Sequence, residues 1–369
     1  MANNSFITVK EIARKTLPRL LENLVFPNLV YKDYSGDFVE GKGATIQVKK
    51  PVLLEAKEFN EAQGTSAQAV NETSVDVTLD KLATVDVEFG AIERVTNVDS
   101  LDRQFLTPAA EALAQKINSD GLMLYRDIPY VVGTAGTTPS SLADIANVRK
   151  ALNINKVPTA NRKAVWDPEA DAKFTTIEAI VNAEKSGSTQ ALREGSIGKI
   201  FGLDNYMSQA VKVHKKGTLT GTPKPKAAVN AGATSLTLAG TTLTGTLVKG
   251  DILTILGDTY VVKNDATAAE NEITVNIYPA LKKNVTTSTA VALTGDHTAN
   301  LAFNPNAFAF VCRPLASPAG VESYVTSFNG ISLRVVKGYD MKYKRDMLSM
   351  DVLYGYKTMY EELAQRVMG

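Results

Sequence analysis

The sequence predicts an α+β protein in which a small all-β domain is inserted into a larger host. Short segments of alternating apolar and polar residues occur near both ends of the chain, and such alternation is typical of half-buried strands. A stretch beginning at Pro108 has apolar residues at helical spacing, which indicates a long helix with one buried face. From Thr220 to about Thr298 the chain is rich in Thr, Gly, Ala and Val and lacks helical spacing, so an all-β structure is predicted there. The length of 369 residues is enough for about two or three domains.

Composition and charge limit the partners that the chain can attract. The 40 basic and 39 acidic residues give a net charge of +1, so no strong overall field draws in nucleic acid or anionic lipid. Near-neutrality also leaves little electrostatic repulsion between copies, which allows close self-packing. The single cysteine, Cys312, lies in the apolar run FAFVCRPL; no intrachain disulfide can form, and we expect a buried small residue rather than a nucleophile.

The first residues, MANNSFITVKEIARK, have no apolar core flanked by a cleavage site, so they are not interpreted as a signal peptide. No apolar run in the sequence approaches the roughly twenty residues needed to cross a membrane. We therefore expect a protein that folds in a cytoplasm and has no membrane partner.

Residues 5–30 are predicted to be helical. Thr8 and Glu11 have the spacing of a capping box at the helix start. Pro18 should kink this segment or begin a second helix, and Pro27 should end it. Because the segment precedes every predicted strand, we interpret it as an arm that packs on a partner surface.

Alternation predicts strands over residues 44–48, 75–79 and 85–89. The first two are separated by more than twenty mostly polar residues without a sustained period. A loop of that length is uncommon in a compact domain and is usually functional or disordered. The pattern therefore predicts a long hairpin that projects from the body.

Further helices and strands follow. Thr107 and Pro108 open the long helix, and a second helix over 139–153 begins at Ser140 or Ser141. Four short strand signals punctuated by Gly, Asn and Asp indicate a small sandwich or barrel in the all-β part, and two strands are predicted after it: TSLTLA, GDILTIL, TYVVK and EITVNIY, then ISLRVV and LSMDVLYG.

Three glycines in eight residues, Gly195, Gly198 and Gly202, raise the question of a phosphate-binding loop. Their spacing is G-x-x-G-x-x-x-G, which differs from the dinucleotide fingerprint G-x-G-x-x-G, and no buried strand precedes them. A phosphate loop also needs Gly-Lys followed by Ser or Thr, whereas Ile200 follows here. The pattern favours turns that need positive φ, with no bound nucleotide.

The two histidines, His214 and His297, lie near the two ends of the predicted inserted domain, so the fold could bring them together. A zinc site needs three or four ligands, and no thiol pair accompanies them. We expect both to be surface histidines, and we expect no metal, no cofactor and no catalytic residue. The basic run KVHKKG is interpreted as a solvated hinge, and KYKRD as a turn between strands.

Several segments together resemble the major capsid protein of tailed bacteriophages, which has the HK97-type fold. The likeness is greatest to the coat proteins of short-tailed phages that carry an inserted immunoglobulin-like domain. It spans most of the chain and rests on the following segments: GATIQVKKP, GTAGTTPSSLADIANVRKALNINKVPTANRKAVWDPEADAKF, LREGSIGKIFGLDNYMSQAV, KGDILTI, NLAFNPNAFAFVCRPL and YDMKYKRDMLSMDVLYG.

The resemblance implies an assignment of the chain to the parts of that fold. The parts are an N-terminal arm, an extended loop with its strands, a peripheral domain with a long spine helix, an axial domain, and an inserted β-barrel or immunoglobulin-like domain. In that order they cover residues 1–35; 36–90; 91–129 with 331–369; 130–218 with 299–330; and 219–298.

The resemblance also implies function and partners. The chain would assemble into pentamers and hexamers of an icosahedral shell, by way of a scaffold-assisted precursor that expands as DNA is packaged. Partners would be further copies of the chain, a scaffolding protein, a portal protein, double-stranded DNA held without sequence-specific contacts, and optionally a decoration protein. The location would be the virion capsid, after assembly in the cytoplasm of the bacterial host.

Leu53, Leu54 and Phe59 are the residues that we expect to anchor the extended loop on an adjacent subunit. Some capsids of this fold are cross-linked by Lys–Asn isopeptide bonds; Lys57 lies in the loop, but a lone lysine does not favour such a bond here. Two other classes of protein remain as alternatives. One is an enzyme with an appended β domain, which the lack of a catalytic constellation disfavours. The other is a tail, decoration or adhesin-type structural protein, which the α/β host disfavours.

Overall fold

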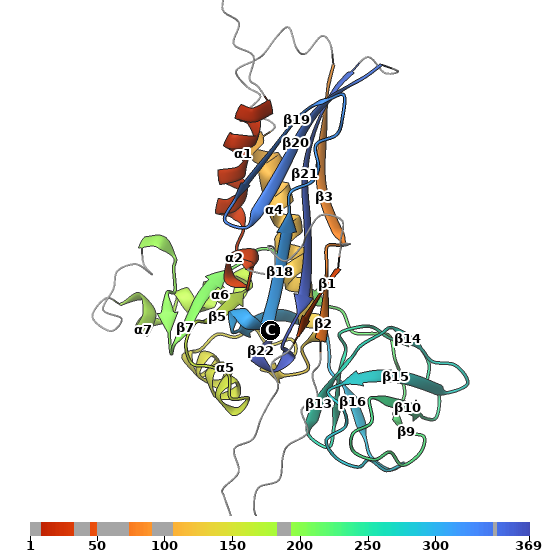
Figure 1. The fold of residues 1–369 in the computed structure, drawn as a ribbon. Coiled ribbons are helices and arrows are strands. Elements are labelled where there is room, and N and C mark those ends of the chain that lie inside the picture. Colours follow the sequence, from red (N-terminus) through yellow and green to blue (C-terminus); the bar gives the residue numbers. More distant parts are fainter. Residues whose placement is uncertain (1–8, 33–44, 50–73, 91–105, 183–192, 342–344) are drawn as a thin grey trace, which may run out of the picture.

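The structure is a computed structural model that describes residues 9–32, 45–49, 74–90, 106–182, 193–341 and 345–369. Figure 1 shows a tall part with two helices against a sheet, a second sheet below it, and a β-rich lobe to one side. The predicted anchor residues Leu53, Leu54 and Phe59, together with Lys57 and the capping residue Thr8, lie outside the described residues.

The tall part contains a five-stranded sheet in the order β18-β21-β20-β19, and β3 also pairs with β21. The pairs are antiparallel. The helices α1 and α4 pack on one face of this sheet (Figure 1). The bounds are β3, Lys81–Gly90; β18, Phe308–Arg313; β19, Glu322–Phe328; β20, Ile331–Asp340; β21, Arg345–Thr358; α1, Val9–Asn23; and α4, Thr107–Leu122.

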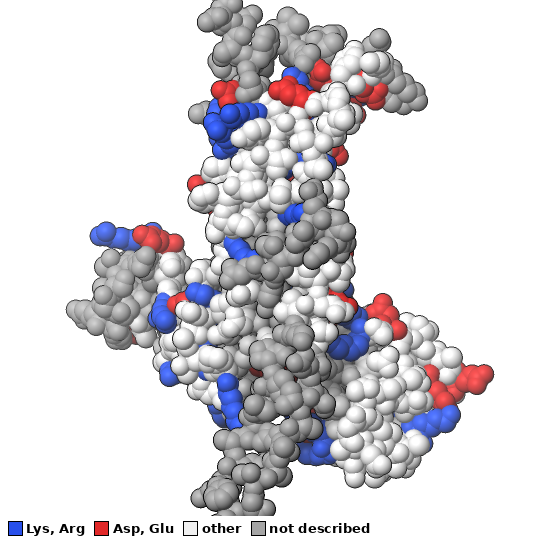
Figure 2. Space-filling model, viewed as in Figure 1, with Lys and Arg blue, Asp and Glu red and all other residues white. Residues whose placement is uncertain are grey.

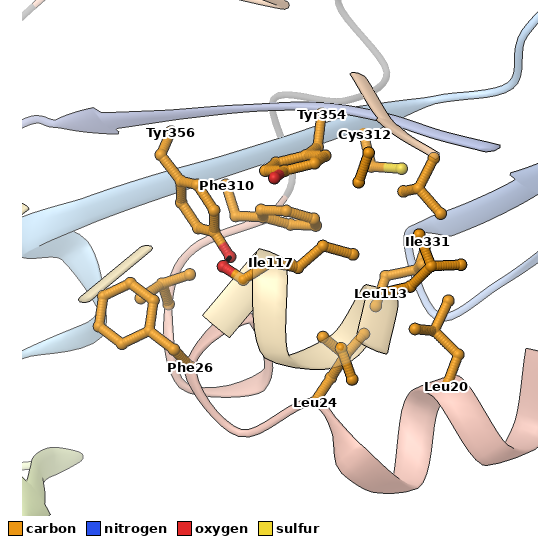
Figure 3. Close-up of a cluster of buried hydrophobic side chains, with 14 of the residues drawn as sticks. Leu20, Leu24, Phe26, Leu113, Ile117, Phe310, Cys312, Ile331, Tyr354 and Tyr356 are labelled. Carbon is orange, nitrogen blue, oxygen red and sulfur yellow. Dashed lines mark hydrogen bonds between the residues drawn. The ribbon is translucent and has the colours of Figure 1, made fainter. Parts of the chain in front are cut away.

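The main core lies between these helices and the sheet (Figure 3). Apolar side chains recur on one face of α4, as the spacing from Pro108 predicts, and pack on aromatic side chains of β18 and β21. Gly121 allows the close approach of α4 to the short helix α2, Phe26–Leu29, because a Cβ there would overlap the Phe26 ring. The labelled members of this cluster are Leu20, Leu24, Phe26, Leu113, Ile117, Phe310, Cys312, Ile331, Tyr354 and Tyr356.

The expectation that residues 5–30 form an arm for a partner surface is wrong for α1. Its apolar face, which includes Ile12 and Leu20, is buried against this chain's own α4, β19 and β20. The helix also continues through Pro18 instead of giving way to a second helix there. A 3.6-residue spacing shows that one face is apolar, but it does not show which surface covers that face.

The second sheet has seven strands, six of them in the order β4-β22-β17-β5-β7-β6, and β8 also pairs with β17. The helix α5, Leu142–Ile154, begins after Ser141, one of the two predicted starting residues, and the Ser141 side chain forms a capping box with Asp144. The bounds are β4, Val131–Val132; β5, Arg162–Trp166; β6, Lys199–Ile200; β7, Leu203–Met207; β8, Val213–His214; β17, His297–Phe303; and β22, Ala364–Met368.

The three clustered glycines lie at turns beside β6 and β7. Gly195, Gly198 and Gly202 have φ values of +65°, +69° and +81°, a region that residues with a Cβ rarely adopt. A Cβ at any of the three would meet no atom within 4 Å, so the glycines serve backbone conformation and not close packing. The prediction of positive-φ turns is confirmed.

The β-rich lobe consists of strands between Lys224 and Leu293. It has a six-stranded antiparallel sheet in the order β16-β12-β13-β15-β10-β9 and a two-stranded sheet of β11 and β14, around an apolar cluster of its own. The four strands predicted here are confirmed as β10, β12, β13 and β15. The bounds are β9, Lys224–Pro225; β10, Ser235–Ala239; β11, Thr246–Leu247; β12, Ile252–Ile255; β13, Asp258–Val262; β14, Ala266–Thr267; β15, Glu272–Tyr278; and β16, Val291–Leu293.

Strands β1, Thr45–Lys49, and β2, Ser74–Thr78, pair antiparallel, which confirms the predicted pairing across the long connection. The predicted axial domain ends at residue 330, and the second part of the predicted peripheral domain begins at residue 331. This boundary separates strands that pair in the structure. β19 lies beside β20 in one sheet, and β22 lies beside β17 in the other. Alternation predicts that a segment is a strand but does not identify its neighbour, so the sheet membership of these strands was not predictable from it.

Candidate functional site

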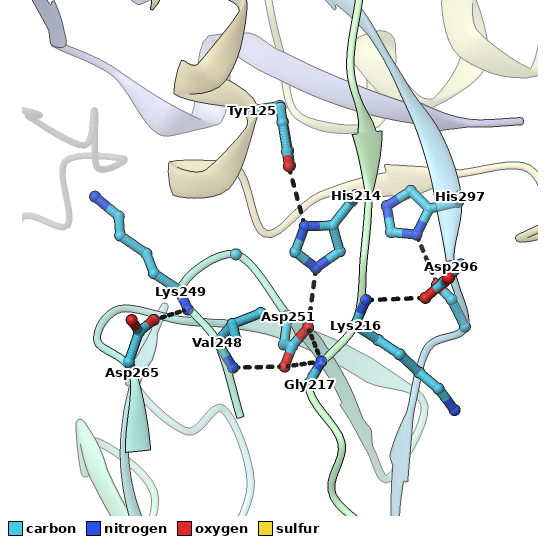
Figure 4. A network of polar contacts seen from close by, with 12 residues as sticks. Tyr125, His214, Lys216, Gly217, Val248, Lys249, Asp251, Asp265, Asp296 and His297 are labelled. Carbon is cyan, nitrogen blue, oxygen red and sulfur yellow. Dashed lines mark hydrogen bonds and ion pairs between the residues drawn. The ribbon is translucent and has the colours of Figure 1, made fainter. Parts of the chain in front are cut away.

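A buried polar cluster lies where the β-rich lobe meets the rest of the chain (Figure 4). We call it the junction. It is formed by Tyr125 from the 3-10 helix η3 (Met123–Asp127), His214 from β8, Asp251 just before β12, His297 from β17 and Arg366 from β22. The exposed fraction of each of these residues is 2% or less. Buried polar groups at this density need a full set of hydrogen-bond partners.

A chain of hydrogen bonds crosses the junction through His214. Its Nε2 lies 2.9 Å from Oδ1 of Asp251, and its Nδ1 lies 3.0 Å from the hydroxyl of Tyr125. A carboxylate accepts hydrogen bonds, so Nε2 carries the proton and donates it, while Nδ1 accepts from Tyr125. Both ring nitrogens of His214 are thus satisfied by groups from two different parts of the chain.

Asp251 also holds two backbone amides at the edge of the lobe. The amide of Val248 donates to Oδ2 at 2.8 Å, and the amide of Gly217 donates to the same oxygen at 3.1 Å. A Cβ at Gly217 would overlap the carbonyl oxygen of Thr246, so only glycine allows this approach. Asp251 therefore ties the segment that enters the lobe to the loop before β12.

Arg366 forms the other half of the junction. Its Nη1 donates to the carbonyl oxygen of Gly250 at 2.8 Å, and its Nη2 donates to that of Tyr125 at 2.6 Å. The guanidinium also lies 4.8 Å from the centroid of the Tyr125 ring, a favourable position for a cation. Burial lowers the pKa of Arg366 to about 10, so the side chain remains charged at neutral pH.

His297 lies against this buried charge. Its Nδ1 is 2.8 Å from the carbonyl oxygen of Gly295, to which it must donate. Its Nε2 is therefore the acceptor, and it lies 3.3 Å from Nη1 of Arg366. Burial, helped by the positive charge of Arg366, lowers the pKa of His297 to about 4. His297 is neutral at physiological pH in this arrangement.

Weaker polar contacts surround the junction and join the lobe to the body. Lys249 Nζ lies 3.1 Å from a carboxylate oxygen of Asp127, and the Thr259 hydroxyl donates to the carbonyl oxygen of Pro129 at 2.8 Å. The Tyr278 hydroxyl donates to a carboxylate oxygen of Glu362 at 2.9 Å. The lobe is thus fixed to the body at several points.

The expectation of two surface histidines is wrong, whereas their predicted proximity is confirmed. β8 and β17 pair so that His214 lies opposite His297, with ring centroids 5.3 Å apart. This pairing places both rings in the junction, beneath the lobe, where each is 2% exposed. Among the described residues, no group of three or more His, Cys, Asp and Glu side chains could hold a metal ion.

Tyr125, Asp251 and Arg366 were not singled out by sequence reasoning. Arginine and aspartate are mostly exposed in proteins, and nothing in the local sequence marks these two as buried. The Gly250–Asp251 pair before an apolar strand is a weak signal, since it also fits an ordinary turn.

Cys312 is buried, as predicted, with 4% of its surface exposed. Burial raises the pKa of its thiol to about 11, so almost no reactive thiolate exists at neutral pH. The amide of Ser332 donates to its sulfur at 3.3 Å.

The basic run KVHKKG is solvated only in part. Lys215 and Lys216 make exposed contacts with Asp296, whereas His214 within the run is buried.

Charged side chains on the face seen in Figure 2 occur as mixed groups of both signs, which agrees with the near-zero net charge. In the portion of the chain that the structure describes, every helix is too short or too polar to span a bilayer.

Comparison with solved structures places the fold among phage capsids. The chain is similar to a structure of Mycobacterium phage Che8, with a TM-score of 0.56 and 18% identity over 93% of this chain and 90% of that one. It is also similar to the capsid structure of the cyanophage P-SCSP1u, with a TM-score of 0.51 and 13% identity over 94% and 88% of the two chains. A third is the mature capsid of bacteriophage PhiM1, with a TM-score of 0.50 and 11% identity over 94% and 86%.

No protein-family model matches the chain, and no curated protein matches it. The structural likeness nevertheless extends over nearly the whole of each chain, so it includes both sheets and the long helix. The α+β capsid fold predicted from the sequence, of HK97 type, is therefore confirmed. The narrower resemblance to coat proteins of short-tailed phages, with an immunoglobulin-like insertion, stays a prediction.

Proposed function

We propose that this chain is a major capsid protein that assembles with copies of itself into the icosahedral shell of a phage. The observation that supports this most directly is the fold shared with phage capsid structures along more than nine-tenths of the chain. Self-assembly of this kind uses contacts between different surfaces of neighbouring copies, which close into rings of five and six. The role is structural and not catalytic.

Each of the two sheets and the β-rich lobe would occupy a different position in the shell. The seven-stranded sheet with α5 would form the axial part, which would pack around the fivefold and sixfold axes. The five-stranded sheet with α4 would form the peripheral part with its spine helix. The β-rich lobe, which makes up most of the predicted insertion 219–298, would lie on the outside of the shell, braced on its own subunit through the junction.

Assembly is proposed to begin with a precursor shell built with a scaffolding protein and closed around a portal protein in the host cytoplasm. Packaging of double-stranded DNA would then expand the shell, and a decoration protein could be added afterwards. The near-zero net charge supports DNA contacts that are few and independent of sequence. Individual contacts between subunits can be weak, because a subunit held by many neighbours must break all of its contacts to leave.

Leu53, Leu54 and Phe59 remain the proposed anchors of the extended loop on an adjacent subunit. Phe59→Ala should lower the yield of shells and their resistance to heat, since it removes a large apolar contact. Val70→Ala, a smaller apolar change in the same polar stretch, is the matched control. Shells of the Phe59→Ala variant that equal the wild type in both respects would contradict the anchor.

The experiment that tests the function is expression of the chain alone and together with a candidate scaffolding protein, followed by sedimentation and negative-stain microscopy. Closed shells, or sheets and tubes of regular hexamers, are the expected result. A stable monomer or dimer under both conditions would refute the proposal and favour a decoration or adhesin-type protein.

A further inference from the structure

Strand β19 forms one edge of the five-stranded sheet. Its residues pair one-to-one with β20, from Glu322 opposite Lys337 to Phe328 opposite Ile331, without a bulge. In the part of the chain that the structure describes, no backbone hydrogen bond joins the other edge of β19 to a further segment. Among the described residues, nothing pairs with the row of N–H and C=O groups on that edge, which has the form that another strand can join.

This edge lacks most of the usual sequence protections against such pairing. Natural edge strands are blunted by lysine, proline, bulges or short length. β19 has the sequence ESYVTSF, with no lysine and no proline, and its only charge is Glu322 at one end. At the other end, Phe328 is 67% exposed, which is high for an aromatic side chain. Its seven residues also exceed the commonest strand length of about five or six.

We propose that β19 pairs with β19 of a second copy of this chain, antiparallel and about a twofold axis at Val325. This register places Val325 opposite its own copy, Tyr324 opposite Thr326, Ser323 opposite Ser327, and Glu322 opposite Phe328. No two like charges face each other, and the aromatic–threonine and hydroxyl pairs are favourable across strands. In a twofold-symmetric pairing of this kind the strand is its own complement.

The surroundings of β19 allow a second sheet to continue from it. Tyr324 packs on the core beneath α1, whereas Val325 lies beside Arg334 of β20 on the opposite face. That face is not covered by α1 or α4 (Figure 1). The paired sheets would then run without interruption through two subunits.

Two seven-residue strands meet over only about 23 Å, at about 3.3 Å for each residue. Such a contact is weak by itself and gains strength when other contacts hold the same subunits together. This strand pairing rests on the proposed self-assembly, because it would be one of the contacts between neighbouring copies in the shell.

The test is disulfide formation by Val325→Cys. Residues directly opposite in an antiparallel pair have Cα atoms about 4.5–5.5 Å apart, within the range that a disulfide bridges. Mild oxidation of particles, or of concentrated protein if no particles form, should give a covalent dimer on denaturing gels. The wild type should give no covalent dimer, because its one cysteine, Cys312, is buried.

Ser327→Cys is the matched control, since in this register Ser327 faces Ser323 and not itself. It should give no dimer alone, whereas co-assembly of Ser327→Cys with Ser323→Cys should give one. Particles without the Val325→Cys dimer would overturn the strand pairing and leave the capsid proposal intact. A Val325→Cys dimer without particles would support the pairing and count against the capsid proposal, and absence of the dimer in both preparations would overturn the pairing.

A second pair of variants tests the pairing without cysteine. Val325→Lys places two positive charges against each other at the axis, whereas Val325→Thr keeps a neutral β-branched side chain. Val325→Lys should lower the yield of particles or concentrated-solution dimer at least several-fold, with recovery at high salt, and Val325→Thr should match the wild type. Equal behaviour of the two variants would contradict the pairing.

Discussion

Acid should loosen the junction through His297, and the structure gives both the direction and the size of the effect. His297 already uses Nδ1 to donate to the Gly295 carbonyl, so an added proton would go to Nε2, which faces Arg366 at 3.3 Å. That proton would turn an acceptor into a donor and place a second positive charge beside a buried guanidinium. Of the other charged or titratable groups near His297, the His214 ring opposes protonation and only the exposed Asp296 favours it.

The magnitude follows from the pKa of His297, which burial lowers from 6.5 to about 4. The unfolded chain therefore binds more protons than the folded chain between these two values, and the free energy of unfolding falls as the pH falls. At about 1.4 kcal/mol for each pKa unit, the loss amounts to about 3 kcal/mol. The contribution is fully present above pH 6.5 and is lost as the pH falls to about 4.

Urea unfolding at pH 7, 5.5 and 4 measures this loss, with the fluorescence of the single tryptophan, Trp166, as the probe. Trp166 is fully buried in β5, so its emission reports unfolding of the body. His297→Gln cannot be protonated and should lose about 3 kcal/mol less than the wild type between pH 7 and pH 4. His214→Gln, which leaves His297 and Arg366 in place, should keep most of the pH dependence, because it removes only the smaller effect of the His214 ring. If His297→Gln and the wild type lose the same stability, the assignment to His297 is refuted.

Three further predictions follow from buried groups. Arg366→Met should lower the free energy of unfolding by about 2–4 kcal/mol, because two buried carbonyl oxygens lose their donors; urea titration measures it, and a loss below 1 kcal/mol would contradict the role of the guanidinium. Gly250→Ala should be more destabilising than Gly257→Ala in thermal melts, since both have positive φ but only at Gly250 would a Cβ come within 2.8 Å of another residue's side chain. Cys312 should react with a thiol reagent at neutral pH only after unfolding, because the thiol is 4% exposed and burial raises its pKa to about 11; rapid labelling of the native protein would contradict this.

Local structure was predictable wherever a short-range rule decides it. Ser141 caps α5 because its hydroxyl and the Asp144 carboxylate satisfy free amides three residues apart, a pattern visible in the sequence. Short strand signals bounded by turn residues likewise identified β12 and β15, which contribute Leu253, Ile255, Ile273, Val275 and Ile277 to one apolar cluster.

Burial at long range was not predictable. His214 and His297 are separated by more than eighty residues, and only the pairing of β8 with β17 decides that both are covered. Arg366 is buried because its strand inserts beside β17 and β4, and its sequence context, AQRVM, is that of an ordinary strand. Polar residues become site residues here through tertiary neighbours, which periodicity does not encode.

The buried polar contacts of the junction oppose movement of the β-rich lobe relative to the body. Arg366 joins the lobe to the body, since its planar group donates to the carbonyl of Gly250 in the lobe and to that of Tyr125 in the body. A displacement that broke the first contact would leave a buried charge short of an acceptor, and breaking a buried charged contact costs about 3–5 kcal/mol. Asp251 adds a second such penalty through its contacts with His214 and Gly217. Small displacements of the lobe are therefore strongly opposed, so in any rearrangement at neutral pH the lobe should move together with the seven-stranded sheet and not on its own.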